Sequence, residues 1–127
     1  MTTGIGDARR QLASILEAAG VRVVFDPGLA AAPCVLVAPA DPWLAPSALA
    51  GGRRTIRWRL IAIAGATDAG VELEAVEAIV AAVVVALDDP QGAPAWSAPT
   101  FDAPGTVDVA GSQYLAAVGR VETLTEV

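Results

Sequence analysis

The chain of 127 residues is long enough for one domain with a substantial hydrophobic core, and its formal net charge is −6, with no histidine. An acidic chain of this kind is a poor candidate for tight nucleic-acid binding, and without histidine it lacks the commonest catalytic base and metal ligand. Hydrophobic residues make up 54% of the chain, yet no apolar run approaches the roughly 20 residues of a membrane span, and no basic segment followed by an apolar one predicts a secretory signal.

The first third of the chain predicts one helix and two short strands, after a flexible or docking tail. Residues 7–19 place apolar side chains on one helical face, with Asp7 as a cap and Gly20 at the position where helices commonly end. Residues 21–25 are apolar except for Arg22, residues 34–38 are apolar throughout, and turn-forming residues bound both segments. We therefore expect two strands that can pair as a hairpin.

The middle of the chain predicts a loop followed by a long strand. Residues 39–52 contain three prolines and Trp43, a composition typical of a loop. Residues 53–64 first alternate polar with apolar side chains and then become apolar at every position. This pattern predicts a strand that is exposed to water at its start and buried at its end.

The strand is followed by the pattern of an amphipathic helix, and we expect this strand and helix to form the centre of the fold. Thr67 or Asp68 can cap the helix, and Asp88, Asp89 and Pro90 stop it. Between these ends the apolar residues follow a spacing of three and four that makes one stripe. The stripe consists of Leu73, Val76, Val80, Val83 and Leu87, widened by Ile79 and Val84.

The last third predicts a long loop and a closing hairpin. Residues 88–104 hold Trp96 and no helical pattern, and such a length is unusual in a compact domain unless the loop has a function. Residues 106–109 and 113–127 predict a hairpin around Gly111, whose long last strand forms an edge of the sheet. The predicted fold is a single α+β domain over residues 1–127, in the order α-β-β-β-α-β-β, with a mostly antiparallel sheet and two helices on one face.

The sequence offers little for catalysis, so we expect no enzyme activity, no catalytic residue, no cofactor and no metal. Serine and cysteine nucleophiles need a base within reach, and the lone Cys34 has apolar neighbours that favour a buried strand thiol. A divalent ion near Asp88, Asp89 or Asp102 is a weaker alternative, because a helix stop explains the first two aspartates. No phosphate-binding or dinucleotide-binding fingerprint is present.

Five residues are the candidates for contacts with a partner. Arg53, Arg57 and Arg59 share one strand face, and Trp43 and Trp96 lie in the two loops. The arginines fit three interpretations: an exposed strand end with local ion pairs, pairing with carboxylates of a neighbouring copy, or contact with DNA phosphates. Each tryptophan either packs against its own domain or anchors a partner.

The order of segments resembles the small tail-terminator or tail-completion proteins of long-tailed phages. The likeness rests on an opening helix with Asp-Ala-Arg-Arg-Gln-Leu at residues 7–12, Gly-Val-Arg-Val at 20–23, and Pro-Cys-Val-Leu-Val at 33–37. A loop with proline and tryptophan, then Trp-Arg-Leu at 58–60 before the long helix, and a closing hairpin from residue 105 to 127 complete it. This resemblance spans nearly the whole chain. It is a similarity in the order and size of the segments, because the family has no short invariant motif.

The resemblance implies a homo-oligomeric ring, a hexamer in this family, located in the tail or neck of a virion and assembled in the host cytoplasm. Such a ring caps the tail tube, ends its polymerisation and presents a surface to the head completion or connector protein, and DNA later passes through its lumen. Its partners are then further copies of itself, the major tail tube protein and the connector, without a membrane. The alternatives are another neck or minor tail protein, such as a head–tail connector or stopper, and a small-ligand-binding α+β domain.

Overall fold

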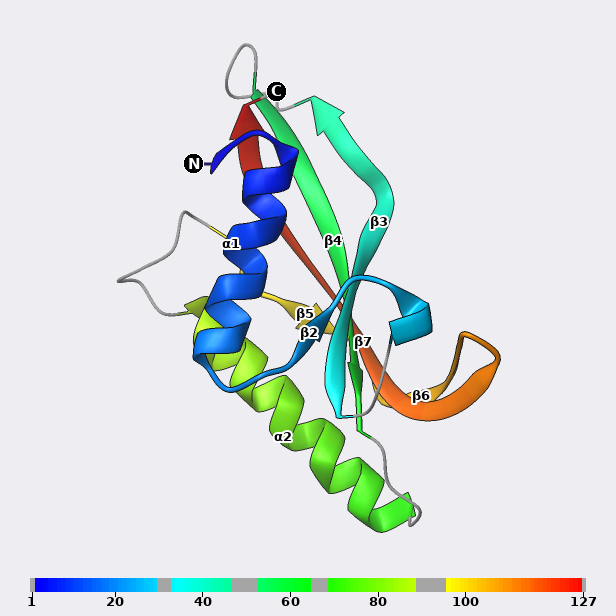
Figure 1. Ribbon diagram of the computed structural model, residues 1–127. Helices are drawn as coiled ribbons and strands as arrows, with labels where there is room; N and C mark the ends of the chain where they lie inside the picture. Colours follow the sequence, from blue (N-terminus) through cyan, green and yellow to red (C-terminus); the bar gives the residue numbers. More distant parts are fainter. Residues whose placement is uncertain (1, 30–32, 47–52, 65–68, 89–95, 127) are drawn as a thin grey trace.

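Two helices lie against one face of a twisted sheet (Figure 1). The computed structural model describes residues 2–29, 33–46, 53–64, 69–88 and 96–126. In chain order the elements are β1 (Thr2–Thr3), α1 (Ile5–Ala18), β2 (Val23–Val24), the 3₁₀ turn η1 (Pro27–Leu29), β3 (Cys34–Pro46), β4 (Arg53–Ile63), α2 (Ala69–Asp88), β5 (Thr100–Phe101), β6 (Gly105–Val109) and β7 (Ser112–Glu126). The predicted α+β class and element order are confirmed, and β1 and β5 are two-residue additions.

The long strand β4 is the middle of the sheet. It pairs with β3 on one side and with β7 on the other, and both pairings are antiparallel. The β4–β7 pairing runs without a register shift from Arg53 opposite Glu126 to Ile63 opposite Ala116. The prediction of a strand that is buried at its end is confirmed, since the stretch from Leu60 to Ala64 is buried on both faces. Nearer its start, Arg59 is exposed, whereas Arg54 and Arg57 are partly buried.

Three short strands pair with the edge of β7 that faces away from β4. β6 pairs with its start, β5 with its middle and β1, in parallel, with its end. Between them the Ser97 N–H donates to the Glu122 carbonyl, and the Asp102 N–H donates to the Val118 carbonyl, both at 2.8 Å. The expectation that the last strand forms a sheet edge was therefore wrong, because other segments of the chain satisfy the backbone groups of β7. Of the two alternatives for the N-terminal tail, flexible or docking, the pairing of β1 with β7 favours docking, here on the chain's own sheet.

The other margin of the sheet is β3, which is longer than predicted. The expected loop from residue 39 is strand up to Pro46, interrupted by a register shift between Pro39 and Leu44, and residues 47–52 lie outside the described residues. Beyond Leu36, no strand in the described part of the chain pairs with the outer side of β3. Its three prolines lack an N–H donor, which limits further strand pairing along this edge.

β2 and β3 do not form the expected hairpin. They pair in parallel, with Val23 opposite Val35 and Val24 opposite Leu36. The connection between them includes η1, so that the chain enters β3 in the same direction as β2. The hydrophobic pattern predicted both strands, but it holds no information on their relative direction.

The first helix starts earlier than predicted and ends as expected. Its N-cap is Gly4, and Asp7 lies in the first turn, where its carboxylate pairs with Arg10 instead of capping the helix. At the other end Gly20 has a φ of +85°, and the Val21 N–H donates to the Leu16 carbonyl at 3.0 Å. This is a Schellman ending, which requires the left-handed conformation that glycine adopts without a Cβ clash.

The second helix packs with its predicted stripe toward the sheet, except at its first turns. Val76, Val83 and Leu87 are buried, whereas Leu73 is exposed. The expected cap residues Thr67 and Asp68, and the stop at residues 89 and 90, lie outside the described residues.

Two hydrophobic clusters lie on the two faces of the sheet. The larger one joins both helices to the inward side chains of β3, β4 and β7, and it includes Leu12, Leu16 and Trp58. The smaller one lies on the other face, around Leu36 and Ile61, where β6 and β7 curl outward (Figure 1). Burial of a leucine side chain contributes about 1.5–3 kcal/mol, so the helix-side cluster dominates the stability.

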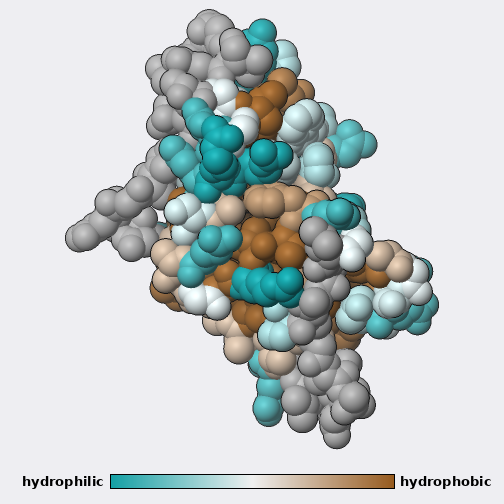
Figure 2. Space-filling model, in the orientation of Figure 1, coloured by the Kyte–Doolittle hydropathy of each residue, from teal (hydrophilic) through white to brown (hydrophobic). Residues whose placement is uncertain are grey.

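Some hydrophobic surface remains exposed after this packing. Figure 2 shows brown hydrophobic residues in the middle of one face, bordered by teal hydrophilic patches. The large hydrophobic side chains that stay exposed are Phe25, Trp43, Leu73 and Val85.

Candidate functional site

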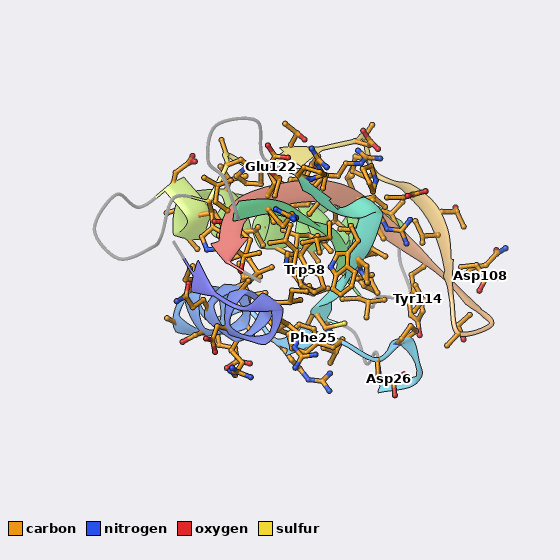
Figure 3. All side chains as sticks on the ribbon, turned by 90° about the horizontal axis from the view of Figure 1, so that it is seen from above. Phe25, Asp26, Trp58, Asp108, Tyr114 and Glu122 are labelled. Carbon is orange, nitrogen blue, oxygen red and sulfur yellow. The ribbon has the colours of Figure 1, made fainter. Side chains whose placement is uncertain are left out.

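The predicted arginine row lies on the sheet face that points away from the helices. Trp58 and Leu60 point into the helix-side cluster, so the alternation of β4 turns Arg57 and Arg59 to the opposite face. In Figure 3, Trp58 lies on the inner side of the sheet and Glu122 on the outer side. There the Nε of Arg57 donates to a carboxylate oxygen of Glu122 at 2.9 Å, which gives this arginine a partner within its own sheet.

Arg59 lies directly opposite a second arginine, Arg120 of β7. Arg120 forms an ion pair with Asp102 at 3.4 Å, whereas Arg59 is exposed and forms no ion pair with any described side chain. Like charges in directly opposite positions destabilise a sheet. Arg120 was not among the predicted contact residues, because its position beside Arg59 follows from the strand register and from no local pattern. We call the outer sheet surface formed by Arg57, Arg59 and Arg120 the arginine face.

The remaining arginine candidate, Arg53, starts β4 opposite Glu126. Its side chain lies outside the part of the structure that is described. The next residue, Arg54, has the parity of the helix side and is partly buried. The structure therefore brings together Arg57, Arg59 and Arg120 and gives Arg53 a backbone position on the same strand.

Trp43 lies at the open margin of the sheet, on the irregular part of β3. Its side chain is 38% exposed, and its ring meets Trp58 edge-on, with the ring centroids 5.8 Å apart. Trp58 belongs to the helix-side cluster. Trp43 therefore packs partly against its own domain and also presents a large aromatic surface to solvent, a combination that suits an interface anchor.

Trp96 is buried, which favours packing against its own domain over a contact with a partner. Its side chain is 8% exposed and belongs to the helix-side cluster. The neighbouring Ser97 holds the segment in place, since its Oγ accepts a hydrogen bond from the Glu122 N–H at 2.9 Å. The described part of this loop runs along the edge of β7 that faces away from β4. This contact is a structural reason for the length of the loop.

The outward stripe of α2 is a surface that was not predicted as a contact site. It consists of Glu74, Glu77, Ala78, Ala81, Val85 and Asp88, all of which are exposed. Their spacing along the helix puts them on the side opposite the buried stripe. Its centre is apolar, and it is flanked by carboxylates that form no ion pair with any described side chain. The helix has no arginine or lysine.

A groove of about 450 Å³ lies between the end of α1, the start of β3 and the middle of α2. Apolar side chains dominate its lining, with Val21, Cys34 and Ile79 among them. Of the aspartates weighed for a divalent ion, Asp102 pairs with Arg120, Asp88 is exposed at the helix end, and Asp89 lies outside the described residues. Within the described residues, no three His, Cys, Asp or Glu side chains are grouped closely enough to hold a metal ion.

In the described part of the chain, none of the helices has the length and apolar character that crossing a membrane requires. Comparison with protein-family models and with curated proteins found no match to this chain.

Proposed function

We propose that this chain is a structural virion protein, the ring-forming terminator of a long-tailed phage tail. In this function several copies, six by the family resemblance, close into a ring on the head-proximal end of the tail tube. The ring ends tube polymerisation and offers a surface to the head completion or connector protein. The virion tail or neck is then its location, and DNA later passes through its lumen.

The layout of the fold carries this proposal. The opening helix, the three strands β2 to β4, the long helix α2 and the closing hairpin β6–β7 follow one another in the order that the resemblance implies. The similarity lies in the order and topology of the elements and involves no reactive group. Such a protein functions through the surfaces that contact neighbouring proteins.

The outer surfaces of the domain also suit an assembly part. The arginine face, the outward stripe of α2 and the exposed ring of Trp43 lie on different sides of the molecule and differ in chemistry. A ring needs two different surfaces on each copy, because its contacts are heterologous. Trp43 and the open margin of β3 are suited to a third contact, with the tube or the connector.

The test uses purified full-length chain and tail tubes assembled from the major tail tube protein. We expect the chain to bind one end of each tube as a ring visible by electron microscopy, and to stop the elongation of the tubes when it is added during polymerisation. Tubes that keep growing at the normal rate, with no density at either end, would contradict the proposal. A control with heat-unfolded chain excludes a general effect of added protein.

A small-ligand-binding domain is the second candidate, and the apolar groove beside Cys34 is the observation that favours it. A ligand that binds the folded state alone raises the stability by RT ln(1 + [L]/Kd), about 2.7 kcal/mol at a hundredfold excess over Kd. A thermal-shift screen of small apolar metabolites that finds one strongly stabilising compound, together with tail tubes whose growth the chain does not affect, would favour this candidate over the ring.

A third possibility, another neck or minor tail protein, predicts binding to the connector without an effect on tube growth.

A further inference from the structure

The outward stripe of α2 has the composition of a surface that binds a partner. Val85, in its apolar centre, is 71% exposed, and Leu73 beside the stripe is 41% exposed. A helix that is apolar nearly all round is normally buried. Because Glu74, Glu77 and Asp88 border the apolar centre without a described ion-pair partner, the stripe fits a partner whose own surface carries cations.

The arginine face has the complementary chemistry. Three guanidinium groups lie there within two neighbouring strands, and the described carboxylates that pair with them are Glu122 and Asp102. Arg59 has no ion-pair partner among the described side chains, and it lies opposite Arg120 in the strand register. A carboxylate from outside the domain, placed near Arg59, would relieve this repulsion and gain a paired charge.

The two surfaces form no described ion pair with each other within one molecule. The buried stripe of α2 packs on the inner face of the sheet, so its outward stripe points away from the sheet. The arginine face is on the other side of the same sheet, since Arg57 and Arg59 alternate with the inward Trp58. The domain therefore presents an acidic, apolar-centred surface on one side and a basic surface on the other.

We propose that the outward stripe of α2 in one copy docks on the arginine face of the next copy. The inference rests on the proposed ring function and specifies its subunit contact. The occupant is a second copy because this chain itself carries both complementary surfaces. Such a contact is head-to-tail, so each copy uses both surfaces once and a closed ring leaves neither of them free.

Cross-linking of the full-length chain tests this contact even when the association is weak. Cys34 is the natural cysteine and is buried, so it is replaced by Cys34→Ala. Cysteines are then added by Val85→Cys on α2 and Thr100→Cys, which lies opposite Arg120 at the arginine face. With a short bismaleimide we expect a ladder of dimers, trimers and larger products, whereas a chain with either added cysteine alone gives no ladder.

Charge reversal in the same background identifies the surfaces. We expect Arg59→Glu with Arg120→Glu to lower the cross-linked fraction by about tenfold or more, and Glu74→Arg with Glu77→Arg to do the same. An equimolar mixture of the two reversed chains restores the ladder, because each reversed surface then meets its complement. Arg10→Glu and Glu17→Arg on the exposed side of α1 are matched controls, with the same change of charge for each substitution, and they leave the ladder unchanged. Circular dichroism checks that every variant is folded.

The outcomes separate this contact from the proposed function. If the parent chain gives no ladder, or if the reversed chains cross-link as well as the parent, the contact is wrong, even where the chain still caps tail tubes. If the ladder follows the expected charge pattern but tail tubes are not capped, the contact stands and the tail function fails.

Discussion

The ring of Phe101 lies directly on Gly119, its partner in the β5–β7 pairing. A Cβ added to Gly119 would be 2.6 Å from the Cδ1 and Cε1 atoms of Phe101 and 2.8 Å from its Cζ. Glycine inside a strand costs roughly 0.5–1 kcal/mol relative to alanine, and here the aromatic ring occupies the space of the missing side chain. The contact holds the two-residue strand β5 against the long strand β7.

We therefore expect Gly119→Ala to destabilise the protein by about 1–3 kcal/mol, because the new methyl group displaces the ring. Urea unfolding followed by circular dichroism measures this change. Gly105→Ala in β6 is the matched control, since a Cβ there meets no atom within 4 Å. Combining Gly119→Ala with Phe101→Ala is expected to cost less than the sum of the single changes, because the clash is then absent. Equal stabilities of Gly119→Ala and Gly105→Ala would contradict the overlap.

The turn of the β6–β7 hairpin offers a stabilising change. Its two central residues, Ala110 and Gly111, have φ values of +51° and +86°. This is the backbone of a two-residue turn that favours asparagine followed by glycine, and alanine is strained in the left-handed region. We expect Ala110→Asn to raise the free energy of unfolding by about 1 kcal/mol in a urea titration. Ala103→Asn, in an exposed segment without a positive φ, is the control, and an equal effect at both positions would argue against the turn as the cause.

The elements with strong local patterns were predictable from the sequence. The alternation from residue 53 to 59 and the apolar run after it gave β4, and the spacing of Val76, Val83 and Leu87 gave α2. What local patterns do not encode is which strands meet and in which direction. The parallel pairing of β2 with β3, and the two-residue strands β1 and β5 along β7, depend on backbone hydrogen bonds that any residue type can make.

The same limit applies to the candidate site. Alternation alone placed Arg57 and Arg59 on one outer face, but only the register brings Arg120 opposite Arg59. The burial of Trp96 follows from Ser97 bonding to β7, about 25 residues further along the chain. The outward stripe of α2 did have a sequence signal, namely a helix whose solvent side carries Ala78, Ala81 and Val85 where charged residues are usual.

The two candidate tryptophans are expected to respond differently to truncation. Trp43 is partly exposed and contacts Trp58 at one ring edge, so we expect Trp43→Ala to cost only about 0.5–1.5 kcal/mol in folding. Trp96 is buried, and Trp96→Ala should cost about 3–5 kcal/mol. Its Nε1 has no hydrogen-bond acceptor among the described residues, so Trp96→Phe should be much milder. Urea titrations of the three variants check this order.

Trp43→Ala is further expected to weaken binding to tail tubes while the chain remains folded, because the exposed ring is a contact surface under the proposed function. Co-sedimentation with tubes measures the bound fraction. Tube binding at the parental level would remove Trp43 from the interface, and a loss of stability as large as that of Trp96→Ala would place it in the core instead.

Arg59 provides a prediction in which folding and assembly change in opposite directions. In the isolated domain Arg59→Glu replaces a repulsive pair with Arg120 by an attractive one, so the free energy of unfolding should rise by about 0.2–1 kcal/mol. The gain should shrink as salt is raised, because both side chains are exposed and exposed charges are screened. Urea titrations at low and high sodium chloride measure it, and Arg10→Glu, which breaks the ion pair with Asp7, is a control that should not stabilise. If Arg59 served folding alone, its replacement would lower the stability; a more stable monomer that assembles less well identifies Arg59 as a residue kept for contact with a neighbour.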